Sequence, residues 1–180
     1  MKTNLLMEPL WPAGRPAEVD LLPAELRDLL DGGWMRGPVN SLLLRSAFGS
    51  GWSSSWNAED VALHEYEVND VWIPPDNIPR ARDVFLPAMV GRARDFTFHA
   101  MRLAEDVQGV DRLVAIISVG IDSDYLTHGT TVKFFTRRGR HLSFYDDLDR
   151  YRTEAIALVE KGGILSECKG SSVFMSQEPR

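Results

Sequence analysis

The sequence predicts an α+β fold, a single domain with a mixed, mostly antiparallel sheet and two to three helices packed mainly on one face. Three observations support this prediction. The almost wholly apolar run 111–121, DRLVAIISVGI, is typical of a buried strand. The run 130–145, TTVKFFTRRGRHLSFY, has the alternation of an antiparallel hairpin. Segment 87–106 repeats apolar residues every three or four positions and predicts a long helix.

The N-terminal region is expected to hold small elements. Residues 1–20 are rich in proline and predict an irregular arm that packs through its leucines and Trp11. Pro23 opens a short helix, which Gly32 and Gly33 end, because proline suits the first helical turn and glycine the residue after the last.

The middle of the chain supplies the remaining strands. Segment 39–47 is too short for periodicity to separate strand from helix. Segment 61–68 alternates and is predicted to be a strand, continued after a turn by 71–73. A path from 61–68 through the long helix to 111–121 would be a right-handed parallel crossover, so the sheet is predicted to be mixed.

The hairpin at 130–145 has a preferred register. With residues 137–139 as a three-residue loop, Phe134 faces Leu142 and Val132 faces Phe144. This pairing makes one face of the hairpin apolar, and burial of that face fixes the register.

The C-terminal region is predicted to be a helix and a tail. The helix runs from a cap at Asp146 or Asp147 to Lys161, and residues 171–180 form a polar tail. No internal repeat or linker divides the chain, so residues 1–180 are expected to form one globular domain.

Composition narrows the class of protein. The chain has 180 residues, 44% of them hydrophobic and 26% charged, as in an ordinary globular protein. No apolar run approaches the roughly 20 residues that span a bilayer, so no membrane partner is predicted. The single cysteine, Cys168, fits a reducing cytoplasm. A net charge of −6 argues against nucleic acid as a partner, and no motif for a cofactor is present.

The strongest functional pattern is an acidic, aromatic segment between Ser46 and Pro79, which contains no lysine or arginine. Tryptophan and tyrosine dominate binding hot spots, and complementary charge speeds encounter. The pattern therefore predicts a protein partner with a basic surface. The alternative is that the tryptophans are core residues and the acids a solvated rim. The candidate partner-binding residues are Trp52, Trp56, Glu59, Asp60, Glu65, Tyr66, Glu67 and Trp72.

A second candidate site lies in the loop after the buried strand. Asp122, Asp124 and His128 would offer ligands to a divalent cation, since carboxylate oxygens suit magnesium or calcium. The competing interpretation is an acidic turn. Glu167 and Lys169 are similar to the Glu-x-Lys end of metal-dependent nuclease sites. These residues support an alternative function, a small metal-dependent hydrolase or nuclease.

Arginines form a third candidate site. Guanidinium groups bind phosphate through paired hydrogen bonds, so a phosphate- or nucleotide-sensing module is a further alternative. This function requires two clusters of arginines to lie close together in the folded protein. The alternative interpretation is that the arginines pair with acidic residues of the same chain. The hairpin cluster is Arg137, Arg138 and Arg140 together with Lys133, and the helix cluster is Arg80, Arg82, Arg92 and Arg94.

In general form the chain is small, acidic and single-domain, without a catalytic signature. This form resembles that of bacterial immunity proteins, which neutralise toxins. The resemblance implies a non-enzymatic, toxin-neutralising binding protein, and this is the leading hypothesis from the sequence.

Overall fold

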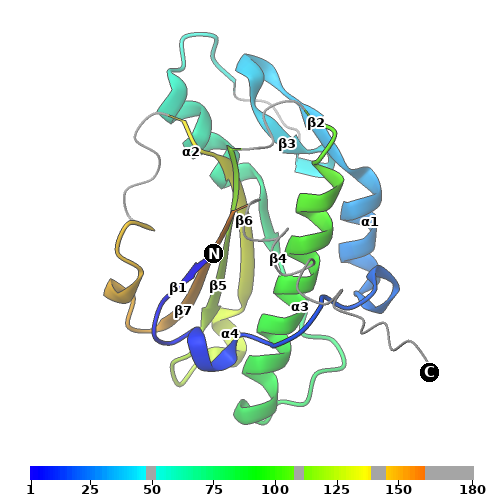
Figure 1. Ribbon diagram of the computed structural model, residues 1–180, viewed down its shortest axis with the longest axis vertical. Helices are drawn as coiled ribbons and strands as arrows, with labels where there is room; N and C mark the ends of the chain where they lie inside the picture. Colours follow the sequence, from blue (N-terminus) through cyan, green and yellow to red (C-terminus); the bar gives the residue numbers. More distant parts are fainter. Residues whose placement is uncertain (48–51, 108–111, 139–144, 161–180) are drawn as a thin grey trace, which may run out of the picture.

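A five-stranded sheet forms the centre of the fold (Figure 1). The computed structural model describes residues 1–47, 52–107, 112–138 and 145–160. The strand order is β1-β7-β5-β6-β4, and every pair is antiparallel. Its strands are β1 (Lys2–Thr3), β4 (Asp70–Trp72), β5 (Leu113–Gly120), β6 (Thr130–Thr136) and β7 (Glu154–Glu160). The predicted α+β class is confirmed, although no parallel pair occurs in the described sheet.

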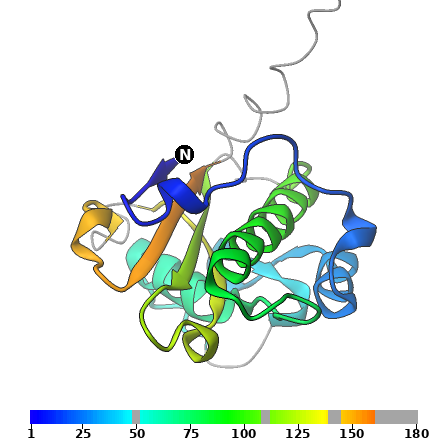
Figure 2. The same cartoon turned by 90° about the horizontal axis from the view of Figure 1, so that it is seen from below.

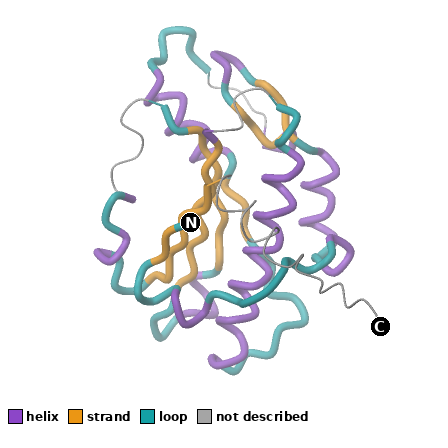
Figure 3. Tube along the Cα trace, viewed as in Figure 1, coloured by secondary structure: helices purple, strands orange, loops and turns teal. Residues whose placement is uncertain are grey.

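A separate two-stranded sheet joins β2 (Trp34–Arg36) and β3 (Leu42–Leu44), as Figure 3 shows. The undecided segment 39–47 therefore contains a strand. Short 3-10 turns lie at Glu8–Leu10, Val19–Leu21, Pro38–Asn40, Arg45–Ala47 and Leu148–Arg150.

The helices surround the larger sheet unevenly. The long helix α3 covers one face, and α1 packs on the same side against α3 (Figures 1 and 2). Helix α2 contacts β6, and its residue Tyr66 packs on the face of the sheet opposite to α3. The helices are α1 (Ala24–Gly32), α2 (Ala58–Val68), α3 (Arg82–Leu103) and the single turn α4 (Tyr125–His128). No helix in the described part of the chain combines the length and apolarity needed to cross a bilayer.

The main core lies between α3 and the inner face of the sheet. Leu86, Met89 and Phe96, all in the predicted helical stripe, are buried there. The helix begins at Arg82 and holds Pro87 in its interior, so the sequence placed its start too late. Leu103, also assigned to the stripe, is 50% exposed near the helix end.

Strands β5 and β6 confirm the strands predicted at 111–121 and in the first half of 130–145. Val132 and Phe134 face the main core, whereas Phe135 joins a smaller cluster on the outer face. β6 pairs with β4 on one side and with β5 on the other, and Thr136 of β6 faces Leu113 of β5. The predicted hairpin partners at 139–144 lie outside the described residues.

The prediction of a strand at 61–68 is wrong, because this segment belongs to α2. Asn57 caps the helix by accepting the backbone N–H groups of Glu59 and Asp60. The Asp60 carboxylate accepts the N–H of Asn57 in return. This reciprocal capping box fixes the helix start and is readable in the sequence as Asn-x-x-Asp.

The predicted C-terminal helix is also wrong. Asp147 caps only a 3-10 turn, and residues 154–160 form β7 between β1 and β5. Asn4 anchors this strand, since its side chain donates to the Glu154 carbonyl at 2.8 Å and accepts the Ile156 N–H at 2.9 Å. Tertiary pairing overrides the helix propensity of the alanine- and leucine-rich sequence. Of the predicted helix, Lys161 lies outside the described residues, as does the predicted tail.

The N-terminal arm is mostly irregular, as predicted, with β1 as its one strand. Arg94 of α3 is 4% exposed and donates to the carbonyls of Pro12, Gly14 and Arg15. Leu5, expected to pack, is exposed, whereas Met7 is fully buried.

Candidate functional site

The outer face of the sheet is apolar at one end and polar at the other. Val114 and Phe135 at the first end pack with Tyr145. Toward the other end Trp72, Thr131 and Ser118 are successive register partners and therefore share this face. Ser118 is the one hydroxyl residue in the apolar sequence of β5.

A cavity of about 360 Å³ opens on this polar end, and it is called the outer-face cavity below. Ser118 Oγ donates to Glu154 Oε2 at 2.6 Å and so orients that carboxylate. Lys133 Nζ lies 2.7 Å from Asp70 Oδ2 and 4.7 Å from the centroid of the Tyr66 ring. The polar residues that line the outer-face cavity include Ser118, His128, Thr131, Lys133, Thr153 and Glu154.

Trp72 borders the outer-face cavity and is 58% exposed. Its register partner Thr131 and the neighbouring Gly129 both line the cavity. Gly129 has a φ of +76°, and a Cβ built on it would lie 3.0 Å from Trp72 Nε1. Glycine at this position therefore allows both the turn and the close approach of the indole.

Two tyrosines meet at the opposite border of the cavity. The hydroxyl oxygens of Tyr66 and Tyr145 are 2.8 Å apart. Burial, followed by the hydrogen bond with Tyr66, raises the pKa of Tyr145 far above its ordinary value. The structure therefore keeps this phenol protonated.

Alkaline pH is expected to destabilise the protein through Tyr145. Above pH ~10 the unfolded chain loses this proton while the folded protein keeps it, because the folded-state pKa is raised. The folded state then binds more protons, so its stability falls by up to ~1.4 kcal/mol per pH unit from this group. Urea unfolding of the wild type and of Tyr145→Phe at pH 8, 10 and 11 measures the difference. Equal slopes above pH 10 would contradict the assignment.

The outward side of α2 is acidic with an apolar centre. Glu59, Asp60 and Glu67 are exposed, and Leu63 between them is 41% exposed. Residues 59, 63 and 67 are spaced by four and so lie on one helical face. The name acidic aromatic surface is used below for Glu59, Leu63 and Glu67 of α2 together with Trp72 of β4.

Trp52 and Trp56 lie at the start of α2 and are both half-buried. Their rings are 5.2 Å apart, and His64 contacts them at 4.1 and 4.7 Å between centroids. The two tryptophans therefore form a partly exposed aromatic cluster with His64, and neither the core nor the surface interpretation describes them fully.

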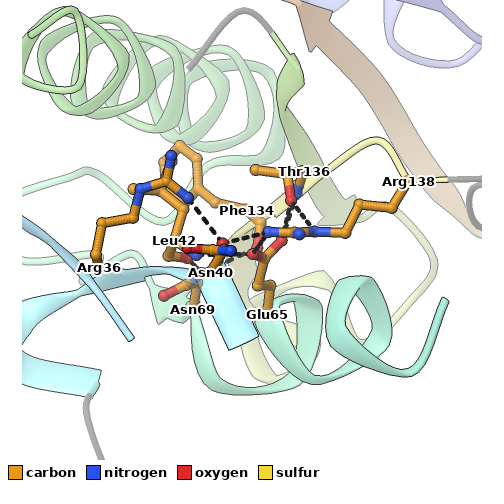
Figure 4. A network of polar contacts seen from close by, with 8 residues as sticks. All are labelled: Arg36, Asn40, Leu42, Glu65, Asn69, Phe134, Thr136 and Arg138. Atoms are coloured by element: carbon orange, nitrogen blue, oxygen red, sulfur yellow. Dashed lines mark hydrogen bonds and ion pairs between the residues drawn. The ribbon is translucent and has the colours of Figure 1, made fainter. Parts of the chain in front are cut away.

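Glu65 requires a correction, because its assignment to a partner-binding surface is wrong. It is 0% exposed and accepts four hydrogen bonds inside the protein (Figure 4). One carboxylate oxygen accepts from the Leu42 N–H at 2.7 Å and from Arg138 at 2.8 Å. The other accepts from the N–H and hydroxyl of Thr136 at 2.7 and 2.5 Å. Glu65 is a buried structural residue.

Asn69, one helical turn after Glu65, extends the same network (Figure 4). Its amide donates to the carbonyls of Leu42 and Phe134, at 2.9 and 3.2 Å, and its oxygen accepts the Leu44 N–H at 2.9 Å. These side chains link β3 of the small sheet to β6 of the large sheet.

The candidate cation ligands come together only in part. His128 Nδ1 lies 3.0 Å from Asp122 Oδ1, whereas Asp124 is exposed and its backbone carbonyl accepts in the α4 turn. Within the described ranges no three His, Cys, Asp or Glu side chains gather as metal ligands. Glu167 and Lys169 lie outside those ranges.

The two arginine clusters do not meet. Arg82 donates to the carbonyls of Ile121 and Asp122 just after β5, whereas the N–H of Arg137 pairs with the carbonyl of Arg112 just before β5. An eight-residue strand separates these positions by roughly 25 Å. Arg137 and Arg138 pair with Glu160 and Glu65, and Arg140 lies outside the described residues. The side chains of Arg82, Arg137 and Arg138 therefore bind groups of their own chain.

In the helix cluster, Arg92 and Arg94 donate hydrogen bonds to backbone carbonyls. Arg92 donates to the carbonyls of Pro74 and Asp76, and burial lowers the pKa of Arg92 from its ordinary value. Arg94 pairs with Asp95 at 2.7 Å and holds the N-terminal arm. These arginines stabilise loops of their own chain.

The outer-face cavity brings together residues of two predicted sites. Tyr66 of the partner-binding candidates and His128 of the cation candidates line it, and Trp72 of the partner-binding candidates borders it. Sequence reasoning missed Ser118 and Glu154 of the same cavity, and it assigned Lys133 to the basic hairpin cluster. The lone serine in β5 was the one local signal for it.

Comparison with known protein families, with curated proteins and with solved structures finds no match to this chain. The acidic aromatic surface and the adjoining outer-face cavity are therefore interpreted from their own geometry and charge.

Proposed function

We propose that this protein is a non-enzymatic binding protein whose acidic aromatic surface recognises a basic surface of a protein partner. The exposure of Trp72, together with that of the acidic residues on α2, is the observation that supports this most. A large aromatic side chain left 58% exposed is typical of an interface anchor.

Charge supports a basic partner. Segment 46–79 contains no lysine or arginine. Arg138 neutralises the buried Glu65, and Lys133 neutralises Asp70. Glu59, Asp60 and Glu67 remain exposed on α2, and their negative potential would speed encounter with a cationic surface.

The partner class that fits the resemblance to immunity proteins is a toxin. A toxin that acts on nucleic acid or anionic substrates needs a basic active surface, and an acidic protein can cover it. Binding alone would then inhibit the toxin, without any chemistry in this chain.

The proposal is tested by capture followed by measured affinity. Immobilised protein captures partners from a lysate of the source cells, and each captured protein is purified and titrated against variants. Trp72→Ala and Glu67→Lys are each expected to raise Kd at least ~10-fold. The increase caused by Glu67→Lys should be largest at low salt. Matched controls are Leu21→Ala, in the 3-10 turn before α1, and Glu25→Lys in α1, which change exposed residues and should alter Kd less than ~2-fold.

A toxin partner adds a cellular measurement. Co-expression with the wild-type protein should restore growth of cells that express the captured toxin, and Glu67→Lys should restore it less. A partner bound equally by Trp72→Ala, Glu67→Lys and the controls would refute the proposed surface.

A further inference from the structure

We propose that the outer-face cavity holds one cationic side chain, a lysine or arginine, supplied by the protein partner. This inference rests on the proposed function and names the anchor that the acidic aromatic surface recognises. The cavity adjoins that surface at Trp72, and Tyr66 of α2 lines it.

Glu154 is the acidic residue of the cavity wall, and it is left without a cationic partner. Its Oε2 accepts the Ser118 hydroxyl at 2.6 Å. No Lys, Arg or His among the described residues lies within ion-pair distance of this carboxylate, whereas Lys133 and His128 of the same cavity each pair with an aspartate. A half-buried carboxylate that is already oriented favours an incoming cation.

The aromatic groups of the cavity favour the same ligand. Lys133 already places its ammonium 4.7 Å from the centre of the Tyr66 ring, so one aromatic face here receives a cation within the chain. Tyr145 lines the same cavity, and the indole of Trp72 stands at its border. An alkyl chain with a charged end can therefore pack along Trp72 while its head reaches Glu154.

Anions fit the cavity poorly. Asp70 already pairs with Lys133 at 2.7 Å, and Asp122 lies 3.0 Å from His128. A phosphate would meet the negative charge of these aspartates and would face Glu154. The volume, about 360 Å³, is at the small end of ligand pockets and suits one side chain better than a nucleotide.

The test uses a minimal probe and its neutral twin. The ¹⁵N-labelled protein is titrated with N-acetyl-argininamide and with N-acetyl-citrullinamide, which has nearly the same shape without the charge. The arginine probe should shift the Trp72 indole resonance, identified with Trp72→Phe, and the amides of Gly120 and Gly129. The citrulline probe should bind at least ~10-fold more weakly, because it lacks the charge-assisted hydrogen bond.

Two variants connect the binding to the cavity. Glu154→Gln keeps an acceptor for Ser118 and should weaken the arginine probe ~10-fold, and Trp72→Ala should weaken it as well. The matched control is Glu160→Gln, on the same strand but paired with Arg137. No saturable shift, equal binding of both probes, or wild-type affinity in Glu154→Gln would overturn the inference.

Failure of this inference is distinguishable from failure of the proposed function. Suppose that Glu67→Lys releases the captured partner, whereas Glu154→Gln binds both the partner and the probe like the wild type. The proposed partner surface is then supported, and the proposed cation binding in the cavity is wrong. If the arginine probe binds through Glu154 but no captured partner depends on Glu67, the cavity binds cations and the proposed partner surface is wrong.

Discussion

Replacing Glu65 with alanine is expected to destabilise the protein by about 3–5 kcal/mol, the usual cost of removing one partner from a buried ion pair. The carboxylate is 0% exposed and accepts from Leu42, Thr136 and Arg138. Alanine would leave two backbone N–H groups without acceptors and a largely buried guanidinium without its anion. Unsatisfied buried donors add to the cost because they lose water as well as their partner.

Glu67→Ala is the matched control for this prediction. Glu67 lies on the same helix but is exposed, so its loss should change the free energy of unfolding by less than about 0.5 kcal/mol. Urea unfolding of both variants gives the comparison. A double-mutant cycle with Arg138→Ala then isolates the pair, and the two changes should be strongly non-additive. A Glu65→Ala effect as small as that of Glu67→Ala would contradict the buried network.

The contrast between Glu65 and Glu67 explains one error of the sequence prediction. In a strand, residues two apart share a face, so a strand at 61–68 places Glu65 and Glu67 together on the surface. In a helix, residues two apart point away from each other, and residues four apart align. Helix α2 therefore turns Glu65 and Asn69 inward to the two sheets and leaves Glu67 outside.

The elements with the longest periodic patterns were predictable. β5, β6 and α3 have clear apolar runs or stripes, and α1 lies between Pro23 and Gly33 as expected. β7 was not predictable in this way, because its alanines and leucines suit a helix and both of its faces are buried. Its strand conformation depends on β5 and on Asn4, about 150 residues away in sequence.

The candidate site depends still more on long-range pairing. The acidic segment indicated Tyr66 and Trp72, but Glu154 joins Tyr66 in the cavity wall only because β7 lies beside β5. No local pattern distinguishes Glu154 from the other exposed or half-exposed acids of the chain. Its significance follows from the hydrogen bond with Ser118 and from the cavity around it.

Phe134→Ala is expected to cost about 3–5 kcal/mol, the range for large aromatic residues removed from a core. The Phe134 side chain is fully buried on the inner face of β6. Its ring meets Trp34 of the small sheet edge-on, with centroids 5.3 Å apart, and lies 6.1 Å from Phe96 of α3. One residue thus packs the large sheet against both the small sheet and the long helix.

Leu103→Ala provides the comparison, because Leu103 lies on α3 but is half-exposed and should lose about 1 kcal/mol or less. Urea unfolding of both variants, followed by the fluorescence of the tryptophans, measures the difference. Trp34 also donates its indole N–H to the Ala100 carbonyl at 2.7 Å, so the cavity left by Phe134→Ala is expected to loosen a contact that α3 and β2 share. A Phe134→Ala cost no larger than that of Leu103→Ala would contradict this packing. If the two sheets and α3 unfold as one cooperative unit, tryptophan fluorescence and circular dichroism should give coincident urea transitions.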